Sequence, residues 1–349
     1  MKVINNIYGR IVSLENLVMA WDEFKVGKTQ KEDVTEFEFF LEQNLFALHE
    51  ELKTKKYRHG LYTSFYIRDP KVRHIHKATV RDRVLHHAIF RILNPIFEST
   101  FISSSFSCRV GKGTHKGILA LETMIRQVSH NYTKQCYVLK CDVRKFFDSI
   151  DHGVLLEMLS KKIIDRNTNW LLERIIQSFA VGYTTLFERQ GVPIGNLTSQ
   201  LFANVYMNEF DQYVKHKLKV KHYARYTDDF MIVANDRQYL VDLLFPIREF
   251  LQNRLKLILH PKKVSLRKYR QGADFLGSVI LPQYRLLRNK TKRRIFRKLQ
   301  CRVKEFKENK IDEIRLEQSL QSYLGVLSHT NAYHLSDEIK NQFWFWLGE

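Results

Sequence analysis

The segment that most constrains how this chain can fold is a predicted β-hairpin over residues 221–234. Two β-rich runs, Lys-His-Tyr-Ala-Arg-Tyr and Phe-Met-Ile-Val-Ala, flank the short polar turn Thr227-Asp228-Asp229. Two adjacent carboxylates at a hairpin tip repel each other unless a cation lies beside them. An isolated Asp-Asp pair usually indicates only a turn. It indicates a metal site only if other parts of the chain place further ligands beside it.

A third carboxylate follows an earlier predicted strand, residues 136–143. The alternation of side chains along this strand sends Val138, Lys140 and Asp142 to the same side. If the strand pairs beside the hairpin, Asp142, Asp228 and Asp229 converge. Carboxylate oxygens suit Mg²⁺, and two such ions activate a 3′-hydroxyl and stabilise a leaving pyrophosphate. The pattern predicts a catalytic site with two Mg²⁺ ions, for which Mn²⁺ can substitute.

Composition indicates a globular protein with an anionic partner. Hydrophobic residues make up 44% of the chain, and the formal net charge is +20. A surplus of this size attracts a polyanion, most often nucleic acid, although a merely basic protein is the alternative. The four cysteines are scattered without a C-x-x-C pair, so neither a zinc ribbon nor a disulfide framework is expected.

The chain has no predicted membrane or export segment. No apolar run is long enough to span a bilayer, and Arg10, Glu15 and Asp22 interrupt the apolar stretch near the N-terminus. We therefore expect a cytoplasmic protein without a membrane partner.

The remaining elements follow from periodicity and punctuation. Ser13 is a candidate N-cap for a helix, and a second helix is expected over 34–54. Helices are also predicted over 83–97, within 153–179, over 197–217 and from Arg285 onward; strands are predicted over 61–75, around the turn Asp69-Pro70, and within 103–113. No internal repeat or low-complexity linker divides the chain, so the parts are expected to pack as one body.

Several motifs together resemble those of reverse transcriptases. Tyr226-Thr227-Asp228-Asp229 resembles the Tyr-x-Asp-Asp box of that family. In chain order, the other similar segments are Arg81-Asp82-Arg83-Val84 and residues 108–115 (fingers motifs), residues 142–150 and 191–200 (palm motifs), His260-Pro261-Lys262-Lys263, and Phe275-Leu276-Gly277 (the primer-grip turn). The resemblance covers roughly residues 10–335.

This resemblance implies an α+β, right-hand polymerase fold and RNA-directed DNA polymerase (nucleotidyltransferase) activity. Its expected parts are an N-terminal helical extension (1–60), fingers (61–135), a palm with an antiparallel sheet and helices (136–282), a fingers insertion at about 155–190 and a helical thumb (283–349). The implied partners are a template RNA, a cDNA or primer strand and dNTPs. The family pattern also adds the backbone of Val143 to the metal ligands Asp142, Asp228 and Asp229.

The second palm motif departs from most reverse transcriptases, which carry Gln-Gly and then Ser-Pro. Here the residues are Ile194-Gly195 and Ser199-Gln200, which resembles the reverse transcriptases of diversity-generating retroelements, as do residues 196–204 and 322–335. Such enzymes copy a template-repeat RNA with errors opposite adenines. The mutated cDNA replaces part of a target gene, and a small basic accessory variability protein assists. The implied host is bacterial, phage or archaeal.

Two candidates bear on which nucleotide is accepted. The family match implies that Phe147 presses on the sugar and excludes a 2′-hydroxyl, with Phe146 as the better core aromatic. A glutamine at position 194 could hydrogen-bond near the nascent pair, and Ile194 cannot, so we hypothesise that Ile194 relaxes fidelity. The alternative is that Ile194 only packs. Gly195 and Gln200 belong to the same predicted pocket.

Basic candidates bear on the triphosphate. Arg109 matches the fingers arginine that clamps it, and Arg73 is a weaker candidate for the same task. Either residue is otherwise a solvated charge. Lys263 is a candidate proton donor to the pyrophosphate, although Lys262 is the alternative match.

Nucleic-acid contacts are predicted for the primer-grip turn and the thumb. The basic run that begins at Arg285 contains an apolar stripe, which is typical of a helix packed on one side and facing a phosphate backbone on the other. The predicted contact residues are Tyr226, Phe275, Leu276, Gly277, Lys292, Arg293, Arg294 and Arg297. His74 and His76 lack a nearby third ligand and are interpreted as ordinary strand residues.

Three alternatives remain to be weighed. A group II intron-type enzyme with maturase activity needs a splicing domain after the thumb, and only a short stretch follows Leu281. The chain also leaves no room for an RNase H domain. A retron or phage-defence enzyme is disfavoured because no Val-Thr-Gly signature lies near the C-terminus. A non-catalytic RNA-binding protein on the same fold is disfavoured by the three intact aspartates.

Overall fold

The computed structural model describes residues 3–69, 71–181 and 189–349. Its centre is a four-stranded antiparallel sheet with the strand order β4-β5-β3-β6. These strands are β3 (Tyr137–Asp142), β4 (Tyr223–Tyr226), β5 (Asp229–Ala234) and β6 (Ser265–Lys268). The predicted hairpin is β4-β5, and the predicted pairing of the earlier strand beside it is confirmed, with Asp142 opposite Asp229.

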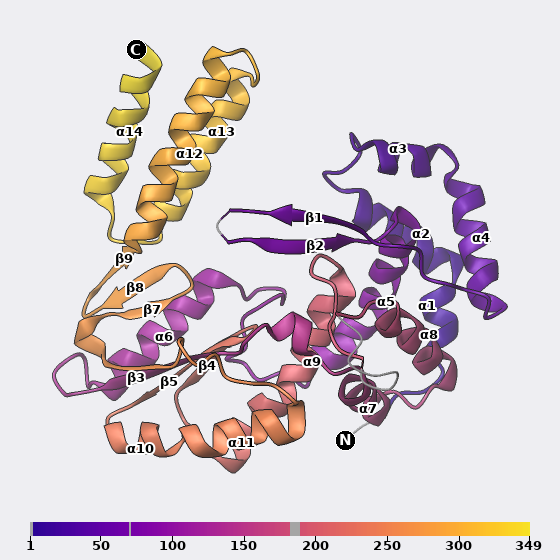
Figure 1. Ribbon diagram of the computed structural model, residues 1–349, viewed down its shortest axis with the longest axis horizontal. Helices are drawn as coiled ribbons and strands as arrows, with labels where there is room; N and C mark the ends of the chain where they lie inside the picture. The colour runs from indigo at the N-terminus through magenta and orange to yellow at the C-terminus, as the bar shows by residue number, and fades with distance from the viewer. Residues whose placement is uncertain (1–2, 70, 182–188) are drawn as a thin grey trace.

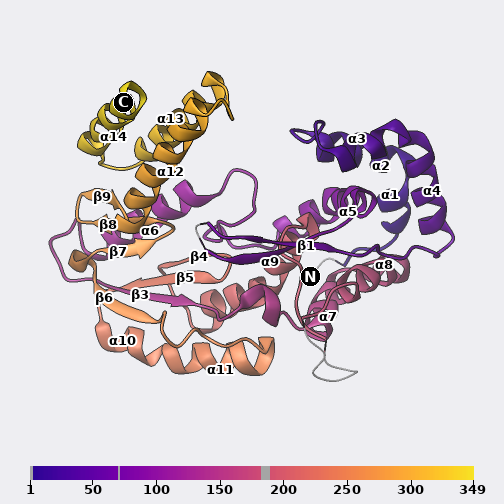
Figure 2. The ribbon, with the colours of Figure 1, turned by 45° about the horizontal axis from the view of Figure 1, so that its top comes forward.

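The two faces of this sheet are covered differently (Figures 1 and 2). Side chains such as Leu139 and Ile232 pack toward α9 (Leu197–Gln212), α10 (Arg237–Asp242) and α11 (Leu244–Leu255). Val138 and Met231 point the other way, because side chains alternate along a strand. They pack with α6 (Thr114–Val128) and with a small antiparallel sheet of β7 (Ala273–Phe275), β8 (Ser278–Leu281) and β9 (Tyr284–Leu287). Helix α6 lies within the range predicted for the fingers but packs on the palm sheet.

Helix α5 (Val80–Glu98) anchors the N-terminal part of the chain. Around it lie α1 (Tyr8–Val12), α2 (Leu14–Lys25), α3 (Glu32–Phe39) and α4 (Leu41–Lys53). The Ser13 cap is confirmed, since its Oγ accepts the Asn16 N–H at 3.2 Å. The single helix predicted over 34–54 is wrong: the chain breaks at Phe40, whose φ of −111° and ψ of 36° end α3 before α4 begins.

A predicted hairpin projects from this helical part toward the C-terminal helices (Figure 1). It consists of β1 (Thr63–Ile67) and β2 (Arg73–Lys77), paired in antiparallel register. Beside the N-terminal helices and α9 lie α7 (His152–Lys162) and α8 (Arg166–Gln177), and the Ile4 N–H donates to the Lys162 carbonyl at 2.9 Å (Figures 1 and 2). The insertion predicted at about 155–190 includes residues 182–188, which lie outside the described residues.

The strand predicted within 103–113 is wrong. This segment makes a single isolated bridge, from Ser105 to Arg225. Cys108 (φ 52°) and Gly111 (φ 70°) are left-handed and cannot continue an extended strand. The segment instead closes on itself through the Gly113 N–H, which donates to the Phe106 carbonyl at 2.9 Å.

The C-terminal helices α12 (Asn289–Lys307), α13 (Glu313–Leu327) and α14 (Tyr333–Gly348) pack as a bundle with its own core. The apolar stripe of the basic run is confirmed, since Ile295, Leu299 and Val303 are buried there. The prediction that the run is helical from Arg285 is wrong at its start, because residues 284–287 form β9. Together these parts confirm the predicted α+β right-hand polymerase fold.

One buried ion pair joins α9 to the central hairpin. The Asp211 and Arg225 side chains are both 0% exposed, and Arg225 donates from Nε and Nη2 to the two carboxylate oxygens of Asp211 at 2.7 and 2.6 Å. Tyr223 donates to the same carboxylate at 2.7 Å. Arg225 also donates to the Thr227 carbonyl at 2.9 Å and to Ser105 Oγ at 3.0 Å. The guanidinium therefore fixes the turn before Asp228 to two other parts of the fold.

We expect Asp211→Asn to lower the free energy of unfolding by about 3–5 kcal/mol, because it leaves Arg225 charged, buried and without a counterion. Urea unfolding followed by circular dichroism measures this change. The matched control is Asp22→Asn on α2, whose exposed ion pair with Lys25 spans 3.0 Å and whose loss should cost about 1 kcal/mol or less. Equal losses in the two variants would contradict this role for Asp211.

Candidate active site

Three aspartates meet at one end of the central sheet. Asp142 ends β3 and Asp229 begins β5, and the two are directly paired in the register. Asp228 sits in the turn between β4 and β5, next to Thr227, whose backbone is left-handed (φ 56°). The Val143 N–H donates to the Asp228 carbonyl at 3.2 Å, which ties this turn to the end of β3. The structure therefore brings the three predicted carboxylates together.

The electrostatics of this cluster favour a cation. Burial, followed by the neighbouring Asp142 carboxylate, raises the pKa of Asp228 to about 6. Burial also raises the pKa of Asp229 to about 6, while Lys140 opposes the rise and Asp142 adds to it. The Oδ1 atom of Asp229 is buried and has no hydrogen-bond partner among the described residues. A bound cation would relieve both the repulsion and the missing contact.

Two lysines already contact the cluster. Lys263 Nζ lies 2.7 Å from Asp142 Oδ1, and Lys140 Nζ lies 3.3 Å from Asp229 Oδ2. Lys140 also donates to the Asp274 carbonyl at 2.8 Å, which holds its ammonium in place. Of the two lysines that the sequence left open, Lys263 is therefore the one whose ammonium reaches the carboxylates.

Whether these residues suit a metal depends on the kind of ion. Within the described ranges, no three His, Cys, Asp or Glu side chains are grouped as a complete metal-binding set. A Mg²⁺ ion, however, often takes only one or two carboxylates and completes its shell with water and substrate phosphates. The unpartnered Asp229 oxygen and the crowded carboxylates fit this incomplete donor set.

The predicted sugar-facing and base-facing residues lie side by side. The Val192 N–H donates to the Phe147 carbonyl at 2.9 Å, and the His76 N–H donates to the Ile194 carbonyl at 3.4 Å. Phe146 is buried in the core whereas Phe147 is only partly buried, as predicted. Gly195 has φ 124°, and a Cβ there would lie 3.3 Å from Ile75 Cγ2, so β2 packs closely on this loop.

The Arg109 guanidinium is bound by groups of the protein itself. It donates to the Glu98 carboxylate at 2.7 Å and to the carbonyls of Ile102 and Ser105 at 2.6 and 2.8 Å. These bonds hold the 103–113 loop together and use most of its donors. Arg73, by contrast, lies exposed on β2, paired with Ile67 through the strand ladder, and its guanidinium makes no hydrogen bond or ion pair with any described residue. The two guanidinium groups therefore differ: that of Arg109 is bound by protein groups, and that of Arg73 is exposed.

The predicted nucleic-acid contact residues of the palm differ in how exposed their side chains are. Phe275 is fully buried, so its side chain serves the core and the prediction of a contact through it needs correction. Leu276 (φ 50°) and Gly277 (φ 94°) form the tight turn itself, and Gln200 is partly buried in the first turns of α9. Tyr226 borders the carboxylates, with its hydroxyl 3.5 Å from Thr114 Oγ1.

The basic residues of α12 face different neighbours: Arg297 and Lys298 lie near Asp69 of the fingers hairpin, whereas Lys292 faces α14. Lys292 pairs with Glu338 at 2.9 Å, and Arg297 lies 3.7 Å from Asp69 near the hairpin tip. Arg293 and Arg297 are exposed and Arg294 is partly so. These positions leave Arg293 and Arg294 available to a polyanion, whereas Lys292 and Arg297 each already face a carboxylate.

The residues that hold the turn between β4 and β5 in place were not predicted from the sequence. Thr227 Oγ1 donates to Ser107 Oγ at 2.6 Å, and Arg225 holds the Thr227 carbonyl. Ser107, which holds Thr227, and Asp211, which holds Arg225, are distant from the hairpin in the chain, so neither periodicity nor a local motif indicates them.

Comparison with known proteins decides the family. The sequence profile of "Reverse transcriptase (RNA-dependent DNA polymerase)" matches residues 67–280. The chain belongs to the reverse transcriptase family. Members of this family generally use divalent metal ions, which agrees with the carboxylate cluster. No helix among the described residues is both long and apolar enough to cross a membrane.

Relatives of known name include two bacterial proteins. Protein YkfC of Escherichia coli (strain K12) is 25% identical over 256 residues, which is 64% of this chain and 65% of that protein. Group II intron-encoded protein LtrA of Lactococcus lactis subsp. cremoris is 23% identical over 310 residues, which is 68% of this chain and 50% of that protein. The chain thus spans less than two thirds of either relative. Among solved structures, apo telomerase from Candida tropicalis, truncated from its C-terminal domain, aligns over 70% of this chain and 60% of that chain with 12% identity and a TM-score of 0.48.

We expect Arg109→Gln to lower the free energy of unfolding by about 1–3 kcal/mol, because Glu98 and two loop carbonyls lose their donors. Arg73→Gln is the matched control, since an exposed side chain without partners should change stability by about 0.5 kcal/mol or less. Urea unfolding of both variants measures the difference. If Arg109→Gln were as stable as the parent, the structural assignment of Arg109 would be wrong.

Proposed function

We propose that the chain is an RNA-directed DNA polymerase that extends a cDNA or primer strand along a template RNA with dNTPs. The observation that carries this proposal is the register of β3 and β5, which pairs Asp142 with Asp229 and leaves Asp228 at the adjacent turn. Carboxylates that converge in this way, one of them with an unpartnered oxygen, suit ions that bind phosphate.

Asp142, Asp228 and Asp229, with the Val143 carbonyl, are the residues that would hold two Mg²⁺ ions, or Mn²⁺ in their place. When bound, the ions would activate the primer 3′-hydroxyl and stabilise the pyrophosphate. Lys263 then has two tasks in turn. Its ammonium, 2.7 Å from Asp142, neutralises part of the cluster before the ions bind, and it would then give a proton to the leaving pyrophosphate.

The nucleotide pocket would lie between β2 and the 191–200 loop. Arg73 would contact the triphosphate from β2, whereas the bonds of Arg109 argue for a supporting role. Phe147 would press on the sugar and reject a 2′-hydroxyl. Lys292, Arg293, Arg294 and Arg297 of α12, with Tyr226 and the Leu276-Gly277 turn, would contact the template and primer backbone, whose affinity would weaken with salt.

We expect Asp228→Asn and Asp229→Asn to abolish primer extension on an RNA template, a loss of about 10³-fold or more, because each removes a metal ligand where negative charge develops. The control is Asp236→Asn, which alters the exposed N-cap acid of α10 and retains a capping side chain. Incorporation of labelled dNTP in the presence of Mg²⁺ measures activity. Extension by either site variant at the parent's rate would refute the proposed function.

Within this activity, we propose error-prone cDNA synthesis for a diversity-generating retroelement. The support is the palm loop, in which Ile194-Gly195 and Ser199-Gln200 replace the commoner Gln-Gly and Ser-Pro. Such an enzyme would work on a template-repeat RNA in the cytoplasm of a bacterial, phage or archaeal host, with a small basic accessory variability protein. The misincorporation would fall opposite template adenines.

A second candidate is a group II intron-derived reverse transcriptase. The observation that favours it is the name of several relatives, among them LtrA and the nuclear intron maturase 1 of Arabidopsis thaliana, which is 33% identical over 93 residues. The two candidates predict different genomic neighbours. A near-repeat beside the gene, differing from its partner only at adenine positions, would support the retroelement; an encompassing intron would support the alternative.

We expect Ile194→Gln to lower misincorporation opposite adenine by about tenfold, because a glutamine amide restores a directional contact to the nascent pair. Ile314→Gln, the same change at an exposed position on α13, is the matched control. Sequencing of cDNA made on a defined RNA template measures the error rate. An Ile194→Gln enzyme as error-prone as the parent would remove the fidelity role of Ile194.

A further inference from the structure

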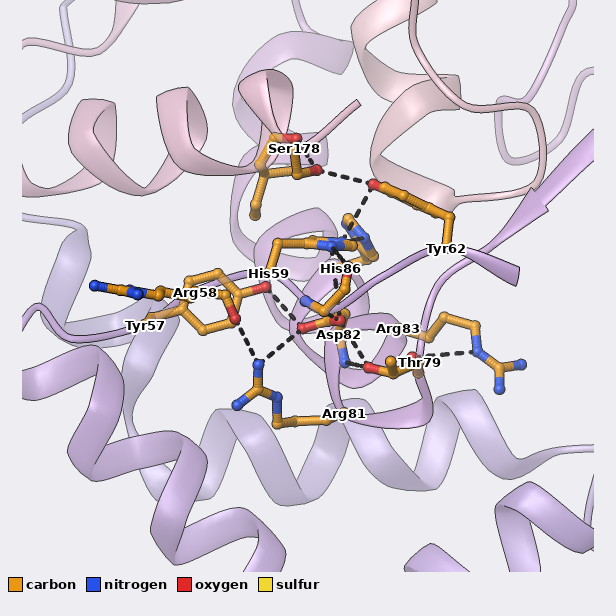
Figure 3. A network of polar contacts seen from close by, with 12 residues as sticks. Tyr57, Arg58, His59, Tyr62, Thr79, Arg81, Asp82, Arg83, His86 and Ser178 are labelled. Carbon is orange, nitrogen blue, oxygen red and sulfur yellow. Dashed lines mark hydrogen bonds and ion pairs between the residues drawn. The ribbon is translucent and has the colours of Figure 1, made fainter. Parts of the chain in front are cut away.

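A buried polar network is built around Asp82 and His86 of α5 (Figure 3). Its centre is Asp82, whose side chain is 0% exposed. The carboxylate accepts hydrogen bonds from the Tyr57 hydroxyl at 2.9 Å, the Thr79 hydroxyl at 2.7 Å and the Gly60 N–H at 2.9 Å. Asp82 therefore fixes residues 57–60, the segment that leads into the fingers hairpin.

A chain of hydrogen bonds runs from this segment into the palm. His59 Nδ1 lies 2.7 Å from the Gly60 carbonyl, and its Nε2 lies 3.3 Å from His86 Nε2. His86 Nδ1 lies 2.8 Å from Thr198 Oγ1. One assignment of donors and acceptors fits these contacts: Thr198 donates to His86, His86 to His59, and His59 to the Gly60 carbonyl. Burial, followed by His59, lowers the pKa of His86 to about 3, which favours the neutral ring.

A side branch reaches a third element. The Tyr62 hydroxyl lies 3.2 Å from His59 Nε2 and 2.9 Å from Ser178 Oγ, at the end of α8. Tyr62, His86 and Thr198 also line a cavity of ≈ 10 Å³ together with the buried Asn196. The network thus connects α5, α8, the stem of the fingers hairpin and the first turn of α9.

Both walls of the proposed nucleotide pocket are connected through the backbone to residues of this network. One wall is β2, which carries Arg73 and whose hairpin begins just after Tyr62. The other is the 191–200 loop, which leads directly into Thr198. The two walls meet where the His76 N–H donates to the Ile194 carbonyl at 3.4 Å. A shift at Thr198 would move Ile194 relative to β2.

We propose that His86 and Thr198 are positioning residues, whose hydrogen bond sets the distance between the 191–200 loop and the fingers hairpin and thereby the fit of the incoming nucleotide. The proposal rests on the proposed polymerase function. Neither residue need touch the nucleotide. Their bond is sheltered from water, where a directional contact holds geometry more firmly than apolar packing does.

The test removes one hydroxyl. Thr198→Val keeps the shape of the side chain and deletes the donor to His86. Thr168→Val is the matched control, because Thr168 on α8 is also fully buried and its Oγ1 has no hydrogen-bond partner among the described residues. Thr198→Ser restores the hydroxyl. For Thr198→Val we expect the KM for dNTP to rise about fivefold, with more misincorporation and with kcat changed by less than about twofold; Thr198→Ser should recover most of the loss.

Hydrogen–deuterium exchange of residues 191–203 is measured on the same proteins. Faster exchange in Thr198→Val than in Thr168→Val is expected, and equal exchange overturns the proposal whether or not the protein polymerises. If the parent makes cDNA and Thr198→Val has the same KM and error rate, the proposal is also overturned while the proposed function stands. If the parent makes no cDNA with Mg²⁺ present, the proposed function fails, and the exchange result alone decides the positioning role.

Discussion

The geometry of the active site depends on the buried pair of Asp211 and Arg225. Each charge is removed from water, a cost that only close pairing and full hydrogen bonding offset. The guanidinium comes close to this condition, because it donates two hydrogen bonds to Asp211, one to the Thr227 carbonyl and one to Ser105 Oγ. In consequence the hairpin turn that carries Asp228 cannot move independently of α9 or of the 103–107 segment. Carboxylates that repel one another are thereby held at fixed positions.

A second constraint acts on the other side of the pocket. The 191–200 loop enters α9 through Thr198, so α9 carries at one end the loop beside Ile194 and at the other the aspartate that anchors the hairpin. The polar network of Asp82 and His86 fixes the first end, and Arg225 fixes the second. Helix α9 is therefore the rigid element that keeps the 191–200 loop and the aspartates of the hairpin at fixed relative positions.

Arg109 and Arg73 show that the sequence could not predict which arginine side chains have partners within the folded protein. Both are arginines of the predicted fingers, Arg109 in a segment that resembles a fingers motif and Arg73 in the strand before it, and the sequence ranked Arg109 first. The fold adds that Glu98 at the end of α5 reaches the Arg109 guanidinium, while the Arg73 guanidinium on β2 has no partner among the described residues. Phe275 is a similar case: its motif predicted a contact, but 0% exposure places its ring in the core.

The sequence by itself determined the strand before Asp142, the hairpin around Asp228 and Asp229, the Ser13 cap and the α12 stripe. These features depend on local periodicity and on the residues preferred in turns, and the order of motifs then indicated the family. Only the tertiary structure decided which cations are free, which acids pair in register and which buried polar groups link the two walls of the pocket. Those outcomes depend on contacts between residues far apart in the chain, where the cost of an unsatisfied buried group selects partners that no local pattern reveals.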